Sequence, residues 1–286
     1  MTGLAKTRGP YCLGLPAWAF PGWKGRYFHD GSTLLHDYAS VFNTVEGNTT
    51  FYRVPKKDTV AAWRDAVAGT DFRFCFKLPR TVTHERTPDL DDLRAFLVAM
   101  EPLGPRLGPF LLQFPARIGP AELPVIESLL DRMPEDFRCV IEVRHPRFFS
   151  EPKTLEPLIA RYRTGRVCLD SRPLYHGDRN HPDVVGALHE KPNLPVLPDV
   201  YNGLAFLRLV MHPEPAGNVA CITEWADRVA EFLQSGVETF VMIHCPNNLH
   251  CPPFALEFHR ALMSRPGMEG LADLPPWPVP QQASLI

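Results

Sequence analysis

Eight short runs rich in Val, Ile, Leu, Phe and Cys recur along the chain at intervals of 28 to 38 residues. They occupy 11–15, 41–46, 72–78, 110–114, 138–144, 166–171, 204–211 and 238–245. Segments with apolar residues at helical spacing separate most of them, at 33–40, 56–68, 91–100, 121–133, 153–162, 223–234 and 253–263. The stretch 172–203 is expected to be irregular. Strands that alternate with helices in this way predict an α/β fold with a parallel sheet.

Eight such units in about 250 residues are typical of a (β/α)8 TIM barrel. The alternative is a doubly wound open sheet, which normally has fewer strands and a glycine-rich first turn. Neither a GxGxxG motif nor a Walker A motif occurs, and no linker interrupts the period. We therefore expect a single barrel domain over 11–264 and an irregular, proline-rich tail over 265–286.

Composition narrows the class of protein further. The 286 residues are 45% hydrophobic and 22% charged, with 30 Lys and Arg against 32 Asp and Glu. This balance excludes a disordered chain and argues against sequence-independent binding to nucleic acid. The seven cysteines include no CxxC pair, which favours reduced thiols in a cytoplasmic protein. The first residues do not resemble a secretory signal, and no apolar run of 18 residues predicts a membrane span.

Charged and amide side chains interrupt the predicted strands, mostly near their C-terminal ends. The residues concerned are Glu46, Arg73, Lys77, Gln113, Glu142, Arg144, Asp170 and Arg208. Because side chains alternate along a strand, they can share the face that points into the barrel, and this end of a barrel holds the active site. An unpaired buried charge costs several kcal/mol. The six charged residues other than Lys77 are therefore either an ion-pair network that only fills the barrel or part of a ligand site, and we favour the ligand site.

Aromatic and polar residues follow the same strand ends and form a predicted rim. They include Trp18, Asn48, Tyr52, Arg80, His84, Asn247 and Asn248. Together with Lys77, Arg144 and Arg208, this rim would suit a small anionic or phosphate-bearing ligand. The usual phosphate cradle after the last two strands is not evident, because Gly217 is the only glycine there.

Several motifs resemble the YecE-like domain-of-unknown-function family (domain of unknown function seventy-two). They lie at 21–25, 42–53, 76–85, 113–115, 142–146, 170–171 and 247–248, in the order and spacing of that family. The resemblance spans 11 to about 263 and implies a (β/α)8 barrel, but it implies no reaction. The first strand departs from the family's Gly-Thr-Ser-Gly-Trp pattern, since it ends Gly14-Leu15-Pro16-Ala17-Trp18.

Three functional hypotheses follow from these residues. The first is an enzyme without an obligate metal, such as a hydrolase or lyase, that acts on a small anionic substrate. Its catalytic candidates are Glu142, Glu46, His84 and Asp170; its binding candidates are Lys77, Arg80, Gln113, Arg144, Arg208, Asn48, Tyr52, Trp18, Asn247 and Asn248. Glu142 or Glu46 would act as general acid or base, and His84 would move protons.

The second hypothesis is a phosphodiesterase or isomerase that uses a divalent metal and acts on nucleic acid or a sugar phosphate. Its oxygen and nitrogen ligands would come from Glu46, His84, Glu142, Asp170, His212, His244 and His250. No HxH or HxxxH pair follows a strand, so no metal ligand is assigned. The third hypothesis is a barrel that binds a ligand without chemistry. A small molecule is the expected partner in each case; a membrane is not expected, and nucleic acid is disfavoured.

Overall fold

The computed structural model describes residues 10–29 and 34–279, and this part of the chain contains eight strands, all paired in parallel. They are β1 (Tyr11–Gly14), β2 (Thr44–Gly47), β3 (Arg73–Phe76), β4 (Phe110–Gln113), β5 (Cys139–Glu142), β6 (Gly165–Asp170), β7 (Leu204–Val210) and β8 (Glu238–His244). Each strand overlaps one of the eight predicted runs. The second strand begins later than expected because Val41 ends the preceding helix.

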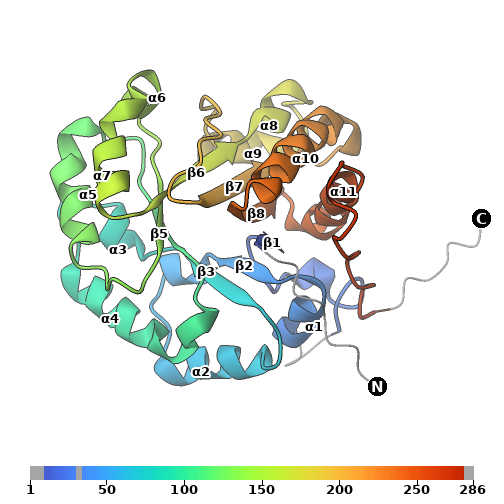
Figure 1. Cartoon of the computed structure of the whole chain (residues 1–286), viewed down its shortest axis with the longest axis horizontal. Helices are drawn as coiled ribbons and strands as arrows, with labels where there is room; N and C mark the ends of the chain where they lie inside the picture. The colour runs from blue at the N-terminus through green and yellow to red at the C-terminus, as the bar shows by residue number, and fades with distance from the viewer. Residues whose placement is uncertain (1–9, 30–33, 280–286) are drawn as a thin grey trace, which may run out of the picture.

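The strands close into a ring (Figure 1). Six are hydrogen-bonded in the order β1-β8-β7-β6-β5-β4, and β2 pairs with β3. The N–H of Glu46 donates to the carbonyl of Leu15 (2.9 Å), and the N–H of Leu78 donates to the carbonyl of Leu111 (3.1 Å), so the pair joins both ends of the larger sheet. Gly14 permits the first junction, because a Cβ there would clash with the carbonyl oxygen of Thr44. The predicted (β/α)8 barrel is confirmed.

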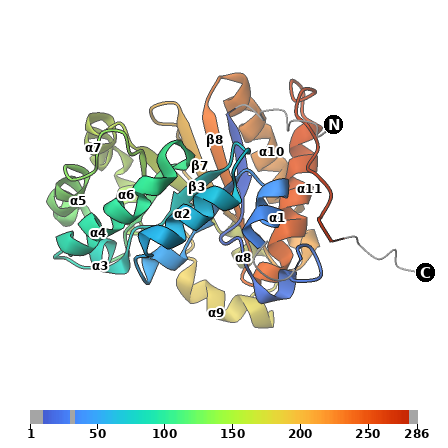
Figure 2. The same cartoon turned by 90° about the horizontal axis from the view of Figure 1, so that it is seen from below.

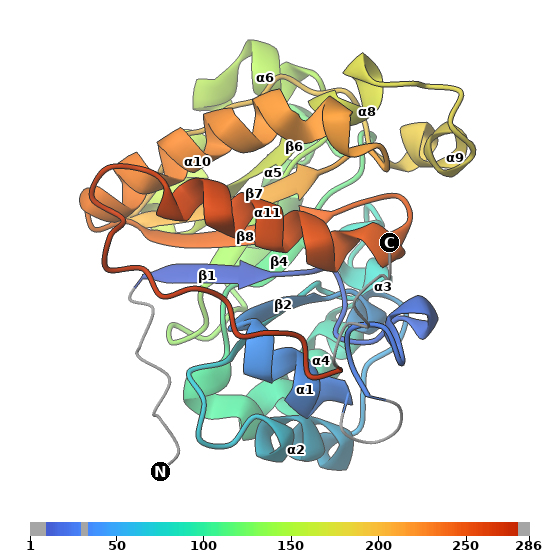
Figure 3. The same cartoon turned by 90° about the vertical axis from the view of Figure 1, so that its right-hand side faces the viewer.

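Helices surround the ring and cover its outer face (Figures 1 and 3). They are α1 (Leu34–Val41), α2 (Lys57–Ala66), α3 (Arg80–Thr83), α4 (Leu90–Met100), α5 (Leu123–Leu130), α6 (Arg147–Ser150), α7 (Glu156–Arg161), α8 (Arg172–His176), α9 (Pro182–Glu190), α10 (Val219–Gln234) and α11 (Cys251–Met263). All seven expected helices are present with shifted ends. Position 33, where the first was expected to begin, lies outside the described residues.

The segment 172–203 is not wholly irregular, which corrects the expectation for it. It contains α8 and α9, and α9 starts at Pro182, a favoured residue in a first helical turn. Val184 of α9 packs on Leu169 and Val210 of the barrel. Figures 2 and 3 show α9 at one end of the molecule, apart from the ring of barrel helices. This helix therefore lies where it can line the mouth of the barrel.

Two apolar layers reflect the alternation of side chains along the strands. The larger layer fills the space between strands and helices and includes Phe74, Ile141 and Leu207. The smaller lies inside the barrel and consists of Cys12, Cys75, Leu111, Val140, Val167, Leu204, Phe206, Phe240 and Met242. The inward face expected for β3, β5 and β7 is the one observed.

The described part of the tail is irregular and returns to the barrel wall. Trp277 packs against Tyr27, Phe28 and Phe42, with ring centroids 5.1, 6.1 and 6.2 Å apart. Residues 280–286 of the expected tail, like residues 1–9, lie outside the described part of the chain. Within residues 10–29 and 34–279, no helix combines the length and the apolar character needed to span a membrane.

Candidate functional site

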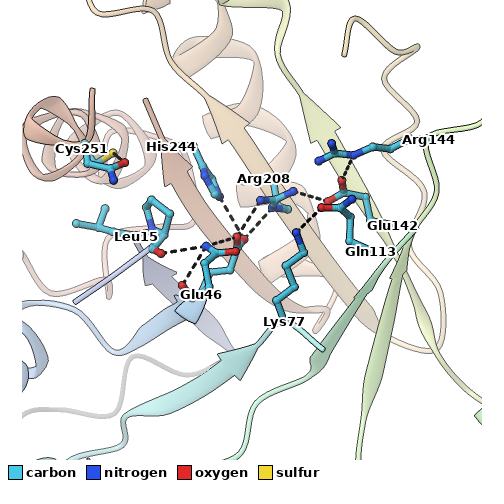
Figure 4. A network of polar contacts seen from close by, with 12 residues as sticks. Leu15, Glu46, Lys77, Gln113, Glu142, Arg144, Arg208, His244 and Cys251 are labelled. Carbon is cyan, nitrogen blue, oxygen red and sulfur yellow. Dashed lines mark hydrogen bonds and ion pairs between the residues drawn. The ribbon is translucent and has the colours of Figure 1, made fainter. Parts of the chain in front are cut away.

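Arg208 of β7 connects two buried glutamates across the C-terminal end of the barrel (Figure 4). Its Nε and Nη2 each donate a hydrogen bond of 2.8 Å to the carboxylate of Glu46. Its Nη1 donates to Glu142 at 2.5 Å. No more than 3% of any of these three side chains is exposed. The network therefore joins β2, β5 and β7 through an almost completely buried guanidinium.

Three further side chains complete the coordination of the two glutamates. Asn48 donates to Glu46 at 2.9 Å, and Nε2 of His244 lies 3.2 Å from the same carboxylate. Arg144 donates from Nε to Glu142 at 2.8 Å and from Nη1 to the carbonyl of Glu190 at 3.0 Å. The network thus runs from the centre of the barrel to the end of α9.

Lys77 lies beside this network, one residue beyond β3, and belongs to a second polar group. Its Nζ donates to Oε1 of Gln113 at 2.6 Å and lies 3.7 Å from the centroid of the Phe51 ring. Nε2 of Gln113 lies 3.3 Å from Nε2 of His84, and Nδ1 of His84 lies 3.0 Å from the hydroxyl of Thr83. A chain of polar contacts therefore leads from the lysine to the half-buried histidine.

Both groups face a pocket of about 630 Å³ at the C-terminal end of the barrel. It is lined by Pro16, Asn48, Phe51, Tyr52, Lys77, His84, Gln113, Arg144, Asp183, Gly186, Ala187, Glu190, Lys191, Arg208, His244, Cys245, Pro246 and Asn248. Loops after the strands form one side of the pocket, and α9 with Lys191 forms the other. Its volume falls in the range of about 300–1,000 Å³ that is common for small-molecule sites.

The glutamates of the network are ionised. Burial alone would raise their pKa values, but Arg208 and His244 hold the pKa of Glu46 well below its usual range. Against the same effect of burial, Arg208 and Arg144 lower the pKa of Glu142 to about 2. A carboxylate with such a low pKa is a weak base at neutral pH. The geometry therefore favours a role for both glutamates in holding the two arginines, rather than in proton transfer.

The two lysines that line the pocket also have lowered pKa values, which for an amine favours the uncharged form. Burial, reinforced by the positive charge of Arg208, lowers the pKa of Lys77 to about 7. The same two causes lower the pKa of Lys191 to about 8. Burial and the nearby Lys77 lower the pKa of His84 to about 4, so this imidazole is neutral at physiological pH. Burial likewise lowers the pKa of His244 to about 4. The pocket therefore contains two amines that titrate close to neutrality and two neutral imidazoles.

Most of the predicted site residues meet in this pocket or in the network beneath it. These are Glu46, Asn48, Tyr52, Lys77, His84, Gln113, Glu142, Arg144, Arg208 and Asn248. Asn247 contributes indirectly, because its side chain donates to Asp183 at 3.2 Å. Tyr52 lies at the rim and is 82% exposed.

Three other predicted site residues lie elsewhere. Asp170 points away from the barrel interior: it accepts hydrogen bonds from Trp225 (2.8 Å) and from Nη2 of Arg172 (2.6 Å), under α10. Trp18 packs on the outer side of the sheet, 5.1 Å from the Trp63 ring and 6.4 Å from the Phe76 ring. Arg80 is exposed on α3 and does not line the pocket.

Arg73 has the predicted inward orientation but occupies the wrong end of the barrel. It pairs with Glu238, which also pairs with Arg138, near the N-terminal ends of the strands. Its position at the start of β3, four residues before Lys77, separates it from the pocket by the length of the strand. The predicted network of six charged residues is therefore two networks plus the separate Asp170 cluster.

The sequence interpretation did not identify the residues that α9 contributes. Asp183, Glu190 and Lys191 line the pocket, yet they lie in the stretch that was expected to be irregular. The available signal was Pro182 followed by apolar Val184, Ala187 and Leu188 at helical spacing. His244 was considered only as a metal ligand, and the structure places it against Glu46.

Of the residues considered as metal ligands, Glu46 and His244 are in contact, but Arg208 occupies the space between Glu46 and Glu142, and the other candidates lie apart. His212 lies in the loop after β7, where its Nε2 is 3.1 Å from the carbonyl of Asp178. His250 packs near Phe254 on α11. Over residues 10–29 and 34–279, no group of three or more His, Cys, Asp or Glu side chains is arranged to hold a metal ion.

Comparisons with known proteins agree with this architecture. A family model described as "Protein of unknown function DUF72" matches residues 12–281. The UPF0759 protein YecE of Escherichia coli K12 is 36% identical over 280 residues, which cover 96% of this chain and 99% of that protein. Two solved DUF72 family structures, from Enterococcus faecalis V583 and Thermotoga maritima MSB8, are each 22% identical with a TM-score of 0.64. They cover 89% of this chain, and 98% and 99% of their own chains.

Proposed function

Because the chain belongs to the DUF72 family, whose description gives no activity, we propose a function from the pocket itself: the protein binds a small anionic molecule at the C-terminal mouth of its barrel. The observation that carries this proposal is the charge balance around the pocket. Arg208 and Arg144 are matched by Glu46 and Glu142. Lys77 and Lys191 have no such match, since no carboxylate among residues 10–29 and 34–279 lies within ion-pair distance of either ammonium group.

Two uncompensated amines beside a pocket favour a negatively charged ligand. Burial and repulsion from the arginines make each protonated lysine unstable, as their lowered pKa values reflect. An anion between them would supply the missing charge and would raise both pKa values. Asp183 and Glu190 also line the pocket, but neither lies within ion-pair distance of Lys77 or Lys191, and Asp183 accepts a hydrogen bond from Asn247.

The surroundings support a small molecule as the ligand. The pocket combines the Phe51 ring and the Pro16 and Pro246 side chains with a few convergent polar groups, as is typical of small-molecule sites. The overall charge of −2 gives no general attraction for a large polyanion. All seven cysteines are buried free thiols, which supports the expected cytoplasmic location.

A thermal-shift screen tests this proposal. The probes are acetate, sulfate, inorganic phosphate and phosphoglycolate at constant ionic strength, with the melting temperature as the readout. A ligand at about a hundredfold excess over its Kd stabilises the folded protein by ~2.7 kcal/mol. We expect at least one anion to raise the melting temperature, and Lys77→Met and Lys191→Met to abolish that rise. Arg80→Met, which removes an exposed cation outside the pocket, is the matched control. If no anion raises the melting temperature, or if both lysine variants respond like the wild type, the proposal is wrong.

A further inference from the structure

We infer that the ε-amine of Lys77 is a nucleophile that forms a Schiff base with an anionic aldehyde or ketone bound in this pocket. The inference rests on the proposed anion site, which would hold the charged group of the substrate, and it adds a reaction and a substrate class. Carbonyl compounds that carry a carboxylate or a phosphate have both the charged group that the anion site would hold and the carbonyl group with which the amine reacts.

The position of Lys77 is fixed by its backbone. Its N–H donates to the carbonyl of Gly47 (3.2 Å), and its carbonyl accepts from the hydroxyl of Thr50 (2.7 Å). The side chain then crosses the Phe51 ring, and only 8% of the residue is exposed. The amine therefore reaches the pocket on a rigid element, which is what a reacting group requires.

The contacts of Nζ leave it able to react. Its hydrogen bond goes to the carbonyl oxygen of the Gln113 side chain, so a neutral amine can donate one hydrogen there and keep its lone pair. A carboxylate partner would instead hold the amine in its protonated form. Burial and the neighbouring Arg208 lower its pKa to about 7. Removal from water and proximity to another cation are the two known ways to activate an amine for this chemistry.

Schiff-base formation needs only the amine and the carbonyl compound, and its one by-product is water. The Nζ lone pair attacks the carbonyl carbon, the C–N bond forms, and the carbonyl electron pair moves to oxygen, which takes up a proton. The nitrogen then loses a proton, and the protonated hydroxyl leaves as water to give the C=N bond. Solvent water that enters the pocket can accept and return these protons, because the pKa of His84, about 4, makes this imidazole a poor base at neutral pH.

Borohydride trapping tests the inference on the full chain. The protein is incubated with pyruvate, with glyceraldehyde 3-phosphate or with acetone, then reduced with sodium borohydride, and the modified lysine is located by peptide mass spectrometry. We expect labelling of Lys77 that exceeds that of any exposed lysine by roughly tenfold or more at pH 7, since a lower pKa leaves more neutral amine. The two anionic probes distinguish an oxo acid from a phosphorylated aldehyde as substrate class, and the uncharged acetone should label Lys77 least.

Two variants make the result decisive. Lys77→Arg removes the nucleophile, so it should lose the adduct at position 77. Lys57→Arg, at an exposed lysine that pairs with Glu101 on the surface, should label like the wild type. If Lys77 gains no adduct while sulfate still stabilises the wild type, the Schiff-base inference fails and the anion site stands. If Lys77 gains no adduct and no anion of the thermal-shift screen stabilises the wild type, both proposals fail.

Discussion

Arg208 donates two parallel hydrogen bonds of 2.8 Å to Glu46, and both side chains are almost completely buried. The two residues are 162 positions apart in sequence and come from β7 and β2, which β8 and β1 separate in the ring. Bidentate contacts of this kind fix geometry as well as charge. They fix Arg208 in the lining of the pocket, to which Lys77 and Lys191 also contribute.

Removal of the central guanidinium should destabilise the fold strongly. Arg208→Met leaves two ionised carboxylates without their main partner, and we expect a loss of about 3–5 kcal/mol in the free energy of unfolding at pH 7. Without Arg208 the folded-state pKa values of both glutamates rise, so the loss should shrink as the pH falls and the carboxylates take up protons. Urea unfolding at pH 7 and pH 4.5 measures both effects.

Arg228→Met provides the surface control for Arg208→Met, because Arg228 pairs with Glu224 on the exposed face of α10. An exposed pair of this type contributes about 0–1 kcal/mol. An Arg208→Met variant no less stable than Arg228→Met would show that the buried network does not carry the charge balance described here.

Replacement of Lys77 by an uncharged residue should stabilise the protein while it removes ligand binding. The folded-state pKa of about 7 lies below the ordinary value of 10.5. Between these pH values the unfolded chain binds a proton at Lys77 that the folded chain does not. The contribution of Lys77 to the free energy of unfolding therefore rises with pH up to about 10.5. At pH 6 Lys77 is protonated in both the folded and the unfolded chain, so the full free-energy cost of burying its charge is present.

We therefore expect Lys77→Met to raise the free energy of unfolding at pH 6 by on the order of 1 kcal/mol, since each unit of pKa shift corresponds to about 1.4 kcal/mol and part is lost with the hydrogen bond to Gln113. The gain should decline towards pH 10. Unfolding curves at pH 6, 8 and 10, with Lys57→Met as the exposed control, measure the trend. If Lys77→Met raises the free energy of unfolding by the same amount at every pH, burial of a charged Lys77 does not destabilise the folded protein.

Asp170 should affect stability but not binding. Its carboxylate accepts hydrogen bonds from Trp225 and Arg172 on the outer side of β6, away from the pocket. We expect Asp170→Asn to cost about 1.5–3 kcal/mol, the usual contribution of hydrogen bonds to a charged group, with an unchanged anion-induced thermal shift. If the variant keeps its stability and loses the thermal shift, Asp170 belongs to the ligand site after all.

The fold could be predicted because its signal is repeated. Eight apolar runs at similar spacing define the barrel even where one boundary is shifted, as at Val41. The inward face of β3 and β5 could also be read, because charged and apolar side chains alternate there. In β6 the same rule gives the wrong orientation: all six residues are buried, and the polar face, with Arg166 and Asp170, points outward rather than into the barrel.

The site was harder to predict where it depends on tertiary structure. Lys191 follows no strand, so the rule that places functional residues at strand ends does not find it; it reaches the pocket because α9 folds over the mouth of the barrel. Likewise, the sequence proposes Glu142 as a proton-transfer group, and only the contacts with Arg208 and Arg144 show that its pKa is too low for that role at neutral pH.

Proton uptake on anion binding tests the central claim most directly. Isothermal titration with sulfate at pH 8, in two buffers of different ionisation enthalpy, gives the number of protons taken up, and sulfate itself does not titrate there. Free Lys77 and Lys191, with pKa values of about 7 and about 8, are mostly or partly neutral at this pH. An anion between them should raise both values, so the account predicts net proton uptake at pH 8, almost none at pH 5.5, and less uptake in Lys77→Met. Sulfate binding at pH 8 without proton uptake, or no binding at either pH, would contradict it.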